Sequence, residues 1–122
     1  MTRLLIVEDD PSLRHLYEAE FADEGYAVTS VGTGEDAVES VRADAPDAIV
    51  LDIRLPGMNG LEVLRGLLER HPGVAVVLNS AYPSYKSDFS CWSADGYVVK
   101  SSDMTELKQA VGAAVRRRRK AA

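Results

Sequence analysis

Four places in this sequence put acidic, hydroxyl or cationic side chains directly after short apolar runs. They are Glu8-Asp9-Asp10, Asp52, Asn79-Ser80 and Lys100. Such apolar runs are typical of strands in a parallel sheet, which is covered on both faces. Ligands bind such sheets at the carboxyl ends of the strands. We therefore expect these polar side chains to meet at one edge of a sheet.

The acids among them predict a metal site. Carboxylates of Glu8-Asp9-Asp10 and of Asp52 would repel one another at adjacent strand ends unless a cation lay between them. A hard cation with oxygen ligands relieves this repulsion, and Mg²⁺ is the first candidate.

The same side chains suit phosphoryl transfer. Lys100 would supply a fixed positive charge and Ser80 a hydrogen-bond donor for the phosphoryl oxygens. An aspartate can act as the nucleophile and form an acyl phosphate.

The elements that must position these residues alternate along the chain, which predicts β-α units on a parallel sheet. Strands are expected over residues 3–7, 27–31, 48–51, 74–78 and 96–99. Helices are expected after Asp10-Pro11, Thr33 and Gly60, and over Met104–Arg117. A short helix anchored by Phe89 and Trp92 is expected between residues 81 and 95. No internal repeat interrupts this order of five strands and five helices.

Charge is unevenly distributed in the 122 residues, whose net charge is -5. Residues 116–120 hold five of the 14 basic side chains, and the residues before them hold all 19 acidic ones. An acidic body attracts cations and repels nucleic acid, so nucleic acid is not expected as a partner of this domain. We divide the chain into a domain of residues 1–117 and a basic tail or linker stub of residues 118–122.

The cellular compartment follows from what the composition excludes. One cysteine, Cys91, allows neither an internal disulfide nor a Cys-based zinc site. The apolar run Leu4–Val7 is too short for a signal peptide, and no run is long enough to span a membrane. We expect a cytoplasmic protein without a membrane partner.

Four motifs resemble the signatures of the receiver domain of bacterial two-component response regulators, of the chemotaxis-regulator type. They are Ile-Val-Glu-Asp-Asp (6–10), Leu-Asp-Ile-Arg-Leu-Pro-Gly-Met-Asn-Gly (51–60), Asn-Ser-Ala (79–81) and Gly-Tyr-Val-Val-Lys (96–100). Their order is that of the family, and the resemblance spans nearly the whole chain. It implies a flavodoxin-like fold, a doubly wound (βα)5 arrangement with a five-stranded parallel sheet and five helices.

The resemblance also implies a role for each site residue. Asp52 would accept a phosphoryl group from a histidine kinase or phosphotransfer protein. The metal ligands for Mg²⁺ would be Glu8, Asp9, Asp52 and the backbone carbonyl of Arg54. Ser80 would be the switch hydroxyl, Tyr97 the aromatic rotamer switch, and Lys100 the lysine that contacts the phosphate. The chain would catalyse nothing beyond its own Mg²⁺-dependent phosphorylation and dephosphorylation at Asp52.

The sequence departs from the family in three ways. Ser80 stands where threonine is commoner, and Ser101 follows Lys100 where proline is usual. The lysine-proline bond of the family is often cis, whereas a cis bond before serine would cost about 2.5–4 kcal/mol. The segment from Ser80 to Lys100 is also about two residues shorter than usual.

Two other functions compete with a phosphorylated receiver. A pseudo-receiver would have the same fold and bind partners without phosphate. A phosphatase with an aspartyl nucleophile would need a second acid two residues after Asp52, where Arg54 stands. The output partner would be another protein, a missing output domain, or a second copy in a homodimer formed on phosphorylation.

Overall fold

The computed structural model describes residues 1–55, 57, 59–81 and 94–121, without the side chains of residues 120 and 121. The short helix predicted between residues 81 and 95 falls almost entirely in residues 82–93, which lie outside the described residues. None of the helices in the described part of the chain is long and apolar enough to cross a membrane.

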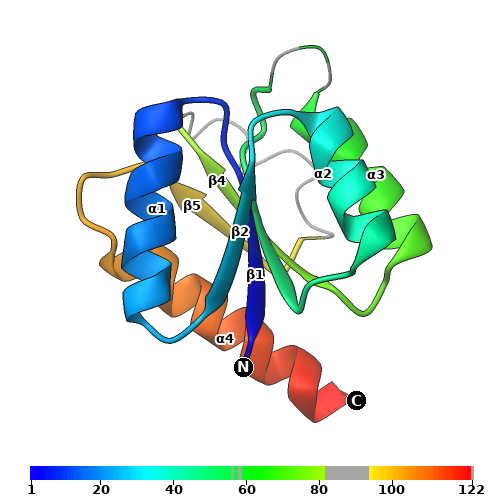
Figure 1. Ribbon diagram of the computed structural model, residues 1–122. Helices are drawn as coiled ribbons and strands as arrows, with labels where there is room; N and C mark the ends of the chain where they lie inside the picture. The colour runs from blue at the N-terminus through cyan, green and yellow to red at the C-terminus, as the bar shows by residue number, and fades with distance from the viewer. Residues whose placement is uncertain (56, 58, 82–93, 122) are drawn as a thin grey trace.

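Five parallel strands form one sheet in the order β2-β1-β3-β4-β5 (Figure 1). Their bounds are β1 Arg3–Val7, β2 Ala27–Val31, β3 Ala48–Leu51, β4 Ala75–Ser80 and β5 Gly96–Val99. The five predicted strands and their parallel arrangement are confirmed. β4 continues two residues beyond its predicted end, so Ser80 lies within the strand.

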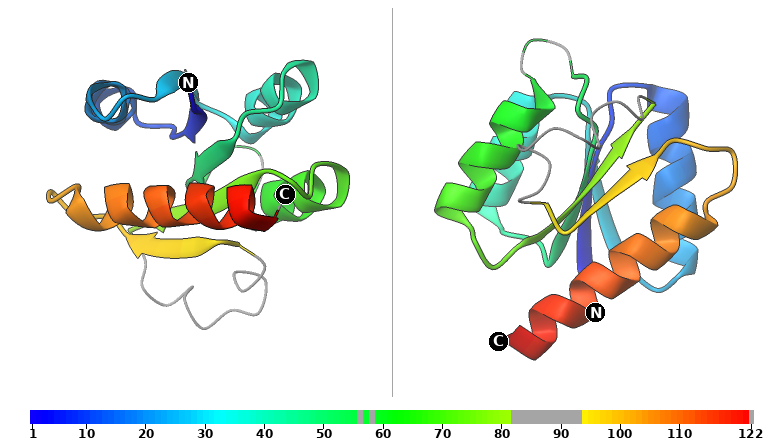
Figure 2. Two further views of the ribbon diagram at one scale, coloured as in Figure 1. Left: turned by 90° about the horizontal axis from the view of Figure 1, so that it is seen from below. Right: turned by 180° about the vertical axis from the view of Figure 1, so that it is seen from behind.

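The sheet is the middle layer of three, because alternate side chains of each strand point to opposite faces. Leu4, Ile6 and Val50 pack with α1 (Pro11–Asp23) and α4 (Thr105–Ala121) on one face. The residues that alternate with these, including Leu5 and Val7, pack with α2 (Gly34–Ala43) and α3 (Gly60–Arg70) on the other. Figure 2 shows the two helix pairs on either side of the sheet. This is the doubly wound arrangement that was predicted.

Two helices begin with capping residues expected from the sequence, and a third begins with a cap that was not predicted, Asn59. Asp10 accepts hydrogen bonds from the backbone N–H groups of Ser12 and Leu13, and Pro11 opens α1. Thr33 caps α2 and Asn59 caps α3 in the same way. These side chains satisfy donors that have no partner within their helix. α1 and α2 therefore begin within four residues of the strands before them, whereas eight residues separate β3 from α3.

The last helix is longer than predicted. It continues past Arg117 to Ala121, and cations are favoured at a helix carboxyl end. Arg118 also makes two hydrogen bonds to the carboxylate of Asp95, at 3.0 and 3.1 Å. The division of the chain at residue 117 stays a prediction, although α4 crosses it without a break.

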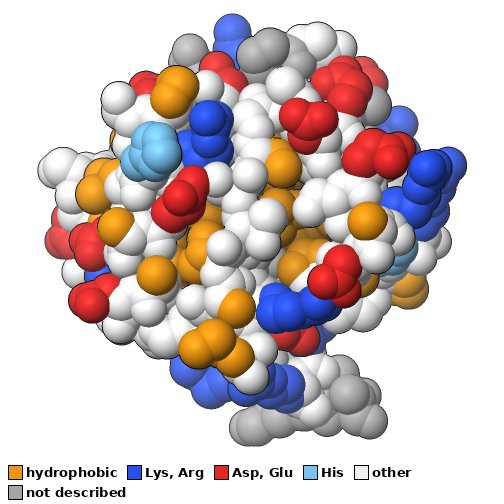
Figure 3. All heavy atoms as spheres, viewed as in Figure 1, with side chains coloured by type: hydrophobic (Ala, Val, Ile, Leu, Met, Phe, Trp, Pro, Cys, Tyr) orange, Lys and Arg blue, Asp and Glu red, His pale blue; other side chains and the backbone are white. Residues whose placement is uncertain are grey.

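β2 lies at one edge of the sheet and is mostly half-buried. Figure 3 shows hydrophobic side chains in the furrow between α1 and α2 and scattered over the rest of this face, among charged side chains.

Candidate functional site

The predicted site residues lie where the chain reverses the order of the strands. β1 and β3 are neighbours in the sheet, with Val7 level with Leu51. Glu8 and Asp52 each follow these residues, and the backbone N–H of Asp52 donates to the carbonyl of Val7 at 3.1 Å. In open parallel sheets the crevice for ligands forms at such a point.

Three carboxylates meet there, as the sequence predicted. Glu8, Asp9 and Asp52 can each place one oxygen within 4.8 Å of the others. Glu8 and Asp52 are buried, with 2% and 5% of their surface exposed, whereas Asp9 is exposed. Two buried acids and one open to solvent make a small anionic cup at the carboxyl edge of the sheet.

Lys100 reaches this cup from the end of β5. Its Nζ lies 2.6 Å from Oε1 of Glu8 and 2.8 Å from Oδ2 of Asp52. Burial acts to lower the pKa of Lys100, but the bonds and charges of the two carboxylates outweigh burial and raise it. Lys100 therefore keeps its charge at neutral pH, and with three carboxylates it leaves a formal charge of about -2 on the cluster.

Glu8 is the most buried acid of the group. Burial raises its pKa, and the nearby Lys100 ammonium and the hydrogen bond from the backbone N–H of Asp10 only partly oppose this rise. Its Oε1 atom is buried and makes no hydrogen bond of normal geometry within the described residues, although the Lys100 ammonium is close. A divalent cation would match both this oxygen and the residual charge. The side chains thus fit the Mg²⁺ ion that the sequence predicted.

Asp52 is held in a defined orientation. Its Oδ1 accepts a 3.0 Å hydrogen bond from the backbone N–H of Arg54, while its Oδ2 accepts the bond from Lys100. The start of α3 presses against the same loop: a Cβ on Gly60 would lie 2.4 Å from the carbonyl oxygen of Asp52. Only glycine fits there.

Ser80 and Tyr97 lie on the same face of the sheet, where Tyr97 packs against the α2 and α3 side of the core. Ser80 is fully buried and Tyr97 is half-buried. β4 and β5 are held together beside the site, since the backbone N–H of Lys100 donates to the carbonyl of Ser80 at 2.7 Å.

The side chain of Asn79 points to the opposite face of the sheet from that of Ser80. Its Nδ2 donates to the hydroxyl of Tyr17 in α1 at 3.0 Å, and both side chains are buried. Burial raises the pKa of Tyr17, so the phenol keeps its proton. Of the Asn79-Ser80 pair, the asparagine therefore serves the contact between β4 and α1.

The peptide bond between Lys100 and Ser101 is trans in the conformation in which Lys100 contacts the acids. The described residues contain no cis peptide bond, so the bond between Lys100 and Ser101 is trans. Of the two geometries considered from the sequence, the structure adopts the one that serine favours.

The sequence interpretation missed two contributors to the site. Gly60 was read only as a loop residue, and Arg14 was not singled out, yet Arg14 Nη1 donates to the carbonyl of Glu8 at 2.9 Å. The asparagine before Gly60 is typical of a helix start. No sequence pattern shows that backbone atoms of Asp52 and Ile53 would lie within 3 Å of a Cβ at Gly60.

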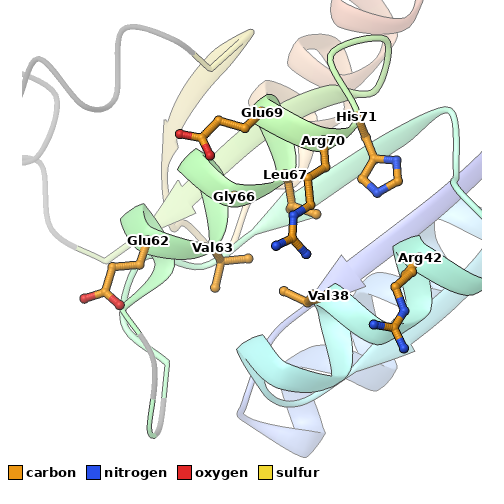
Figure 4. Close-up of a pocket in the computed structure, with 9 residues that line it drawn as sticks. All are labelled: Val38, Arg42, Glu62, Val63, Gly66, Leu67, Glu69, Arg70 and His71. Carbon is orange, nitrogen blue, oxygen red and sulfur yellow. The ribbon is translucent and has the colours of Figure 1, made fainter.

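A separate cavity of about 220 Å³ lies between α2 and α3 (Figure 4). Its floor is apolar, while two arginines and two glutamates give its rim no net formal charge. It is lined by Val38, Arg42, Glu62, Val63, Gly66, Leu67, Glu69, Arg70 and His71. None of these residues belongs to the acidic cluster, so this cavity is separate from the candidate site.

A doubly wound sheet with a buried aspartate, two neighbouring acids and a lysine at its carboxyl edge defines a phospho-acceptor signalling domain. The sequence matches the response regulator receiver domain over residues 4–112, and the chain belongs to this family. It is a receiver domain of a two-component system, and a signalling domain rather than an enzyme.

Solved structures agree with this assignment. The response regulator TrrA of Thermotoga maritima, in complex with Mg²⁺-BeF, is 39% identical with a TM-score of 0.90, covering 93% of this chain and 98% of TrrA. TrrA in complex with the histidine kinase ThkA is 39% identical with a TM-score of 0.87, covering 93% and 97%.

A curated relative is the transcriptional activator protein PfeR of Pseudomonas aeruginosa, 39% identical over 117 residues. The alignment covers 94% of this chain and 38% of PfeR. The chain spans about half or less of the length of the curated relatives that it matches.

Proposed function

We propose that Asp52 accepts the phosphoryl group, from a histidine kinase or a phosphotransfer protein, with Mg²⁺ held beside it. The observation that carries this proposal is the setting of the Asp52 carboxylate, which contacts Lys100 and shares the anionic cup with Glu8 and Asp9. The complexes of TrrA with Mg²⁺-BeF and with a histidine kinase support it, because that protein shares the fold and 39% of the sequence.

The metal ligands would be carboxylate oxygens of Glu8, Asp9 and Asp52 with the backbone carbonyl of Arg54. When bound, Mg²⁺ would neutralise charge on the phosphoryl oxygens.

Side-chain and backbone groups of the chain itself would carry out and assist the phosphoryl transfer. A carboxylate oxygen of Asp52 forms the bond to phosphorus while the bond to the donor's leaving nitrogen or oxygen breaks. Lys100 balances the charge on the transferred group, and the backbone N–H of Arg54 keeps the carboxylate oriented. Water would later hydrolyse the acyl phosphate and restore Asp52, which is the proposed autodephosphorylation.

The added phosphate would then act as a switch. It carries about -1.5 to -2 charges at neutral pH, which would draw the Ser80 hydroxyl and the Lys100 ammonium towards it. Tyr97, on the same face as Ser80, would change rotamer and alter the surface of β5 and α4. This is a local charge that biases a two-state element. The output would be binding of another protein, an output domain or a second copy of the chain.

Acetyl phosphate with Mg²⁺ tests the acceptor directly. Wild-type protein should gain the mass of one phosphoryl group, and its loss over time should report autodephosphorylation. Asp52→Asn is the matched control, because the amide keeps the size of the side chain but is a poor nucleophile. A wild type without the mass gain, or an Asp52→Asn variant that gains it equally, would overturn the proposal.

A Mg²⁺ titration tests the ligand set. Asp9→Asn should bind Mg²⁺ at least tenfold more weakly than wild type, because a charged ligand is lost from a site of few carboxylates. Asp10→Asn should have little effect, since the Asp10 side chain caps α1. Equal affinities of wild type and Asp9→Asn would show that the ligands are wrongly assigned.

A further inference from the structure

The side chain of Arg14 ties helix α1 back to the acidic segment that precedes it. Its Nη1 donates a 2.9 Å hydrogen bond to the backbone carbonyl of Glu8, and the side chain is half-buried. Hydrogen bonds from a charged donor are stronger than neutral ones. The first turns of α1 therefore hold the backbone at Glu8.

Gly32, in the loop after β2, leaves room for this guanidinium. A Cβ at Gly32 would lie 2.9 Å from Nη1 and 3.7 Å from Cζ of Arg14. Gly32 does not have the positive φ for which glycine is otherwise needed. A side chain at position 32 would therefore have to displace the end of the Arg14 side chain.

The same short segment is fixed from its other side. The backbone N–H of Glu8 donates to the carbonyl of Val31 at 3.1 Å, so the loops after β1 and β2 are joined at Glu8. Asp9 follows immediately, and within the described part of the chain its side chain makes no ion pair or hydrogen bond. Its direction therefore depends on the backbone that Arg14 and Val31 hold.

We propose that Arg14, seated against Gly32, is a positioning residue for Mg²⁺ binding, which it strengthens by fixing the backbone that presents Glu8 and Asp9. This inference rests on the proposed function, since it concerns the same metal. Charge and position act in opposite directions here. A positive charge near a cation site weakens binding, whereas a fixed backbone strengthens it. Loss of affinity on removal of Arg14 therefore reports position.

The first test is a Mg²⁺ titration by calorimetry on folded variants. Arg14→Ala should bind Mg²⁺ about three- to tenfold more weakly, the size expected for one lost hydrogen bond. Arg14→Lys should recover part of the affinity, because lysine keeps a long cationic donor. Arg65→Ala, which removes an exposed arginine of α3, controls for charge and should not weaken binding.

The second test uses Gly32. Gly32→Ala should also weaken Mg²⁺ binding, because the new methyl group displaces the guanidinium. In the Arg14→Ala background the same change should cost nothing further, since the next nearest atom, the Glu8 carbonyl oxygen, lies 3.9 Å away. The two changes should therefore be non-additive, as expected for residues that act through one contact.

The outcomes separate this inference from the function on which it rests. Wild-type protein that is phosphorylated and binds Mg²⁺ no better than Arg14→Ala would overturn the inference alone. Fully additive effects of Arg14→Ala and Gly32→Ala would overturn it as well. Wild-type protein that neither binds Mg²⁺ nor gains a phosphoryl group would overturn both. If Arg14→Ala fails to fold, Gly32→Ala and Arg14→Lys decide the question.

Discussion

Two buried carboxylates share the ammonium of Lys100, at 2.6 Å from Glu8 and 2.8 Å from Asp52. Opposite charges at this distance in a partly dry setting attract strongly, and loss of one partner leaves charges without compensation. Lys100 thus stabilises the metal-free protein by partly neutralising two buried carboxylates, in addition to being the candidate for phosphate contact.

Lys100→Ala should destabilise the metal-free protein by about 2–4 kcal/mol at pH 7, because two facing carboxylates remain buried without a cation. Unfolding by urea in the presence of EDTA measures this loss. Added Mg²⁺ should restore part of the stability, since it can replace the lost charge. Lys108→Ala removes a lysine from surface ion pairs of 3.6 and 3.8 Å and should cost less than about 1 kcal/mol.

The loss in Lys100→Ala should depend on pH in a defined direction. Burial raises the pKa of Glu8 above 4.5, so acid protonates Glu8 and removes one of the two facing charges. The deficit should shrink as the pH falls from 7 towards 5. In wild type the pKa of Lys100 is raised above 10.5, so its stabilising contribution is complete below that pH and is lost only at higher pH. A deficit that grows in acid would contradict this electrostatic account.

At the scale of elements, α3 contains two glycines with opposite requirements. Gly60 opens the helix where its backbone N–H donates to Ile53 at 2.7 Å, and a Cβ would collide with the Asp52 loop. Gly66 lies in the helix interior beside the cavity in Figure 4, and a Cβ there would meet nothing within 4 Å. Glycine is required at the first position and unfavourable at the second.

Gly66→Ala should raise the free energy of unfolding by about 0.5–1 kcal/mol, since alanine is the better helix former and has room. Gly60→Ala should lower it by about 1–3 kcal/mol, because the crowded backbones must separate. Urea unfolding of both variants measures the difference. Gly60→Ala should also weaken Mg²⁺ binding, whereas Gly66→Ala should leave it unchanged. Equal stability of the two variants would show that the close approach at Gly60 is not rigid.

At the scale of the whole molecule, the C-terminal end of α4 is bonded to residues at the amino-terminal ends of β4 and β5, at the opposite end of the sheet from the site. Asp95, just before β5, accepts two hydrogen bonds from Arg118 and one from the backbone N–H of Val76. Arg118 also donates to the carbonyl of Pro72 at 2.8 Å. One arginine thus joins the last helix, β5 and the turn before β4.

Arg118→Ala should lower the free energy of unfolding by about 1–3 kcal/mol, because the largely buried Asp95 loses its charged partner. The Mg²⁺ affinity should not change, since this contact lies at the other end of the strands. Arg116→Ala removes the same charge from the same helix without a described ion pair and should cost little. An Arg118→Ala variant as stable as wild type would support a domain that ends at residue 117.

What the sequence determined by itself was the local chemistry. Apolar runs of four or five residues specify strands, Asp10 and Thr33 specify helix starts, and the order of β-α units specifies a parallel sheet. Because parallel strands must end at one edge, the meeting of Glu8, Asp9 and Asp52 also followed from the sequence. The true end of α4 did not, since its last turn depends on the distant Asp95.

Only the tertiary structure decided how distant groups meet. Lys100 lies between Glu8 and Asp52 on a trans bond, at a distance set by the pairing of β4 with β5. Gly60 is required by the backbone of Asp52, and Arg14 reaches Glu8 across the space that Gly32 leaves open. These contacts join groups in different segments of the chain, and no local sequence pattern shows that they lie close together in space. They arise because close packing of the helices on the sheet brings backbones and charges within a few ångströms of one another.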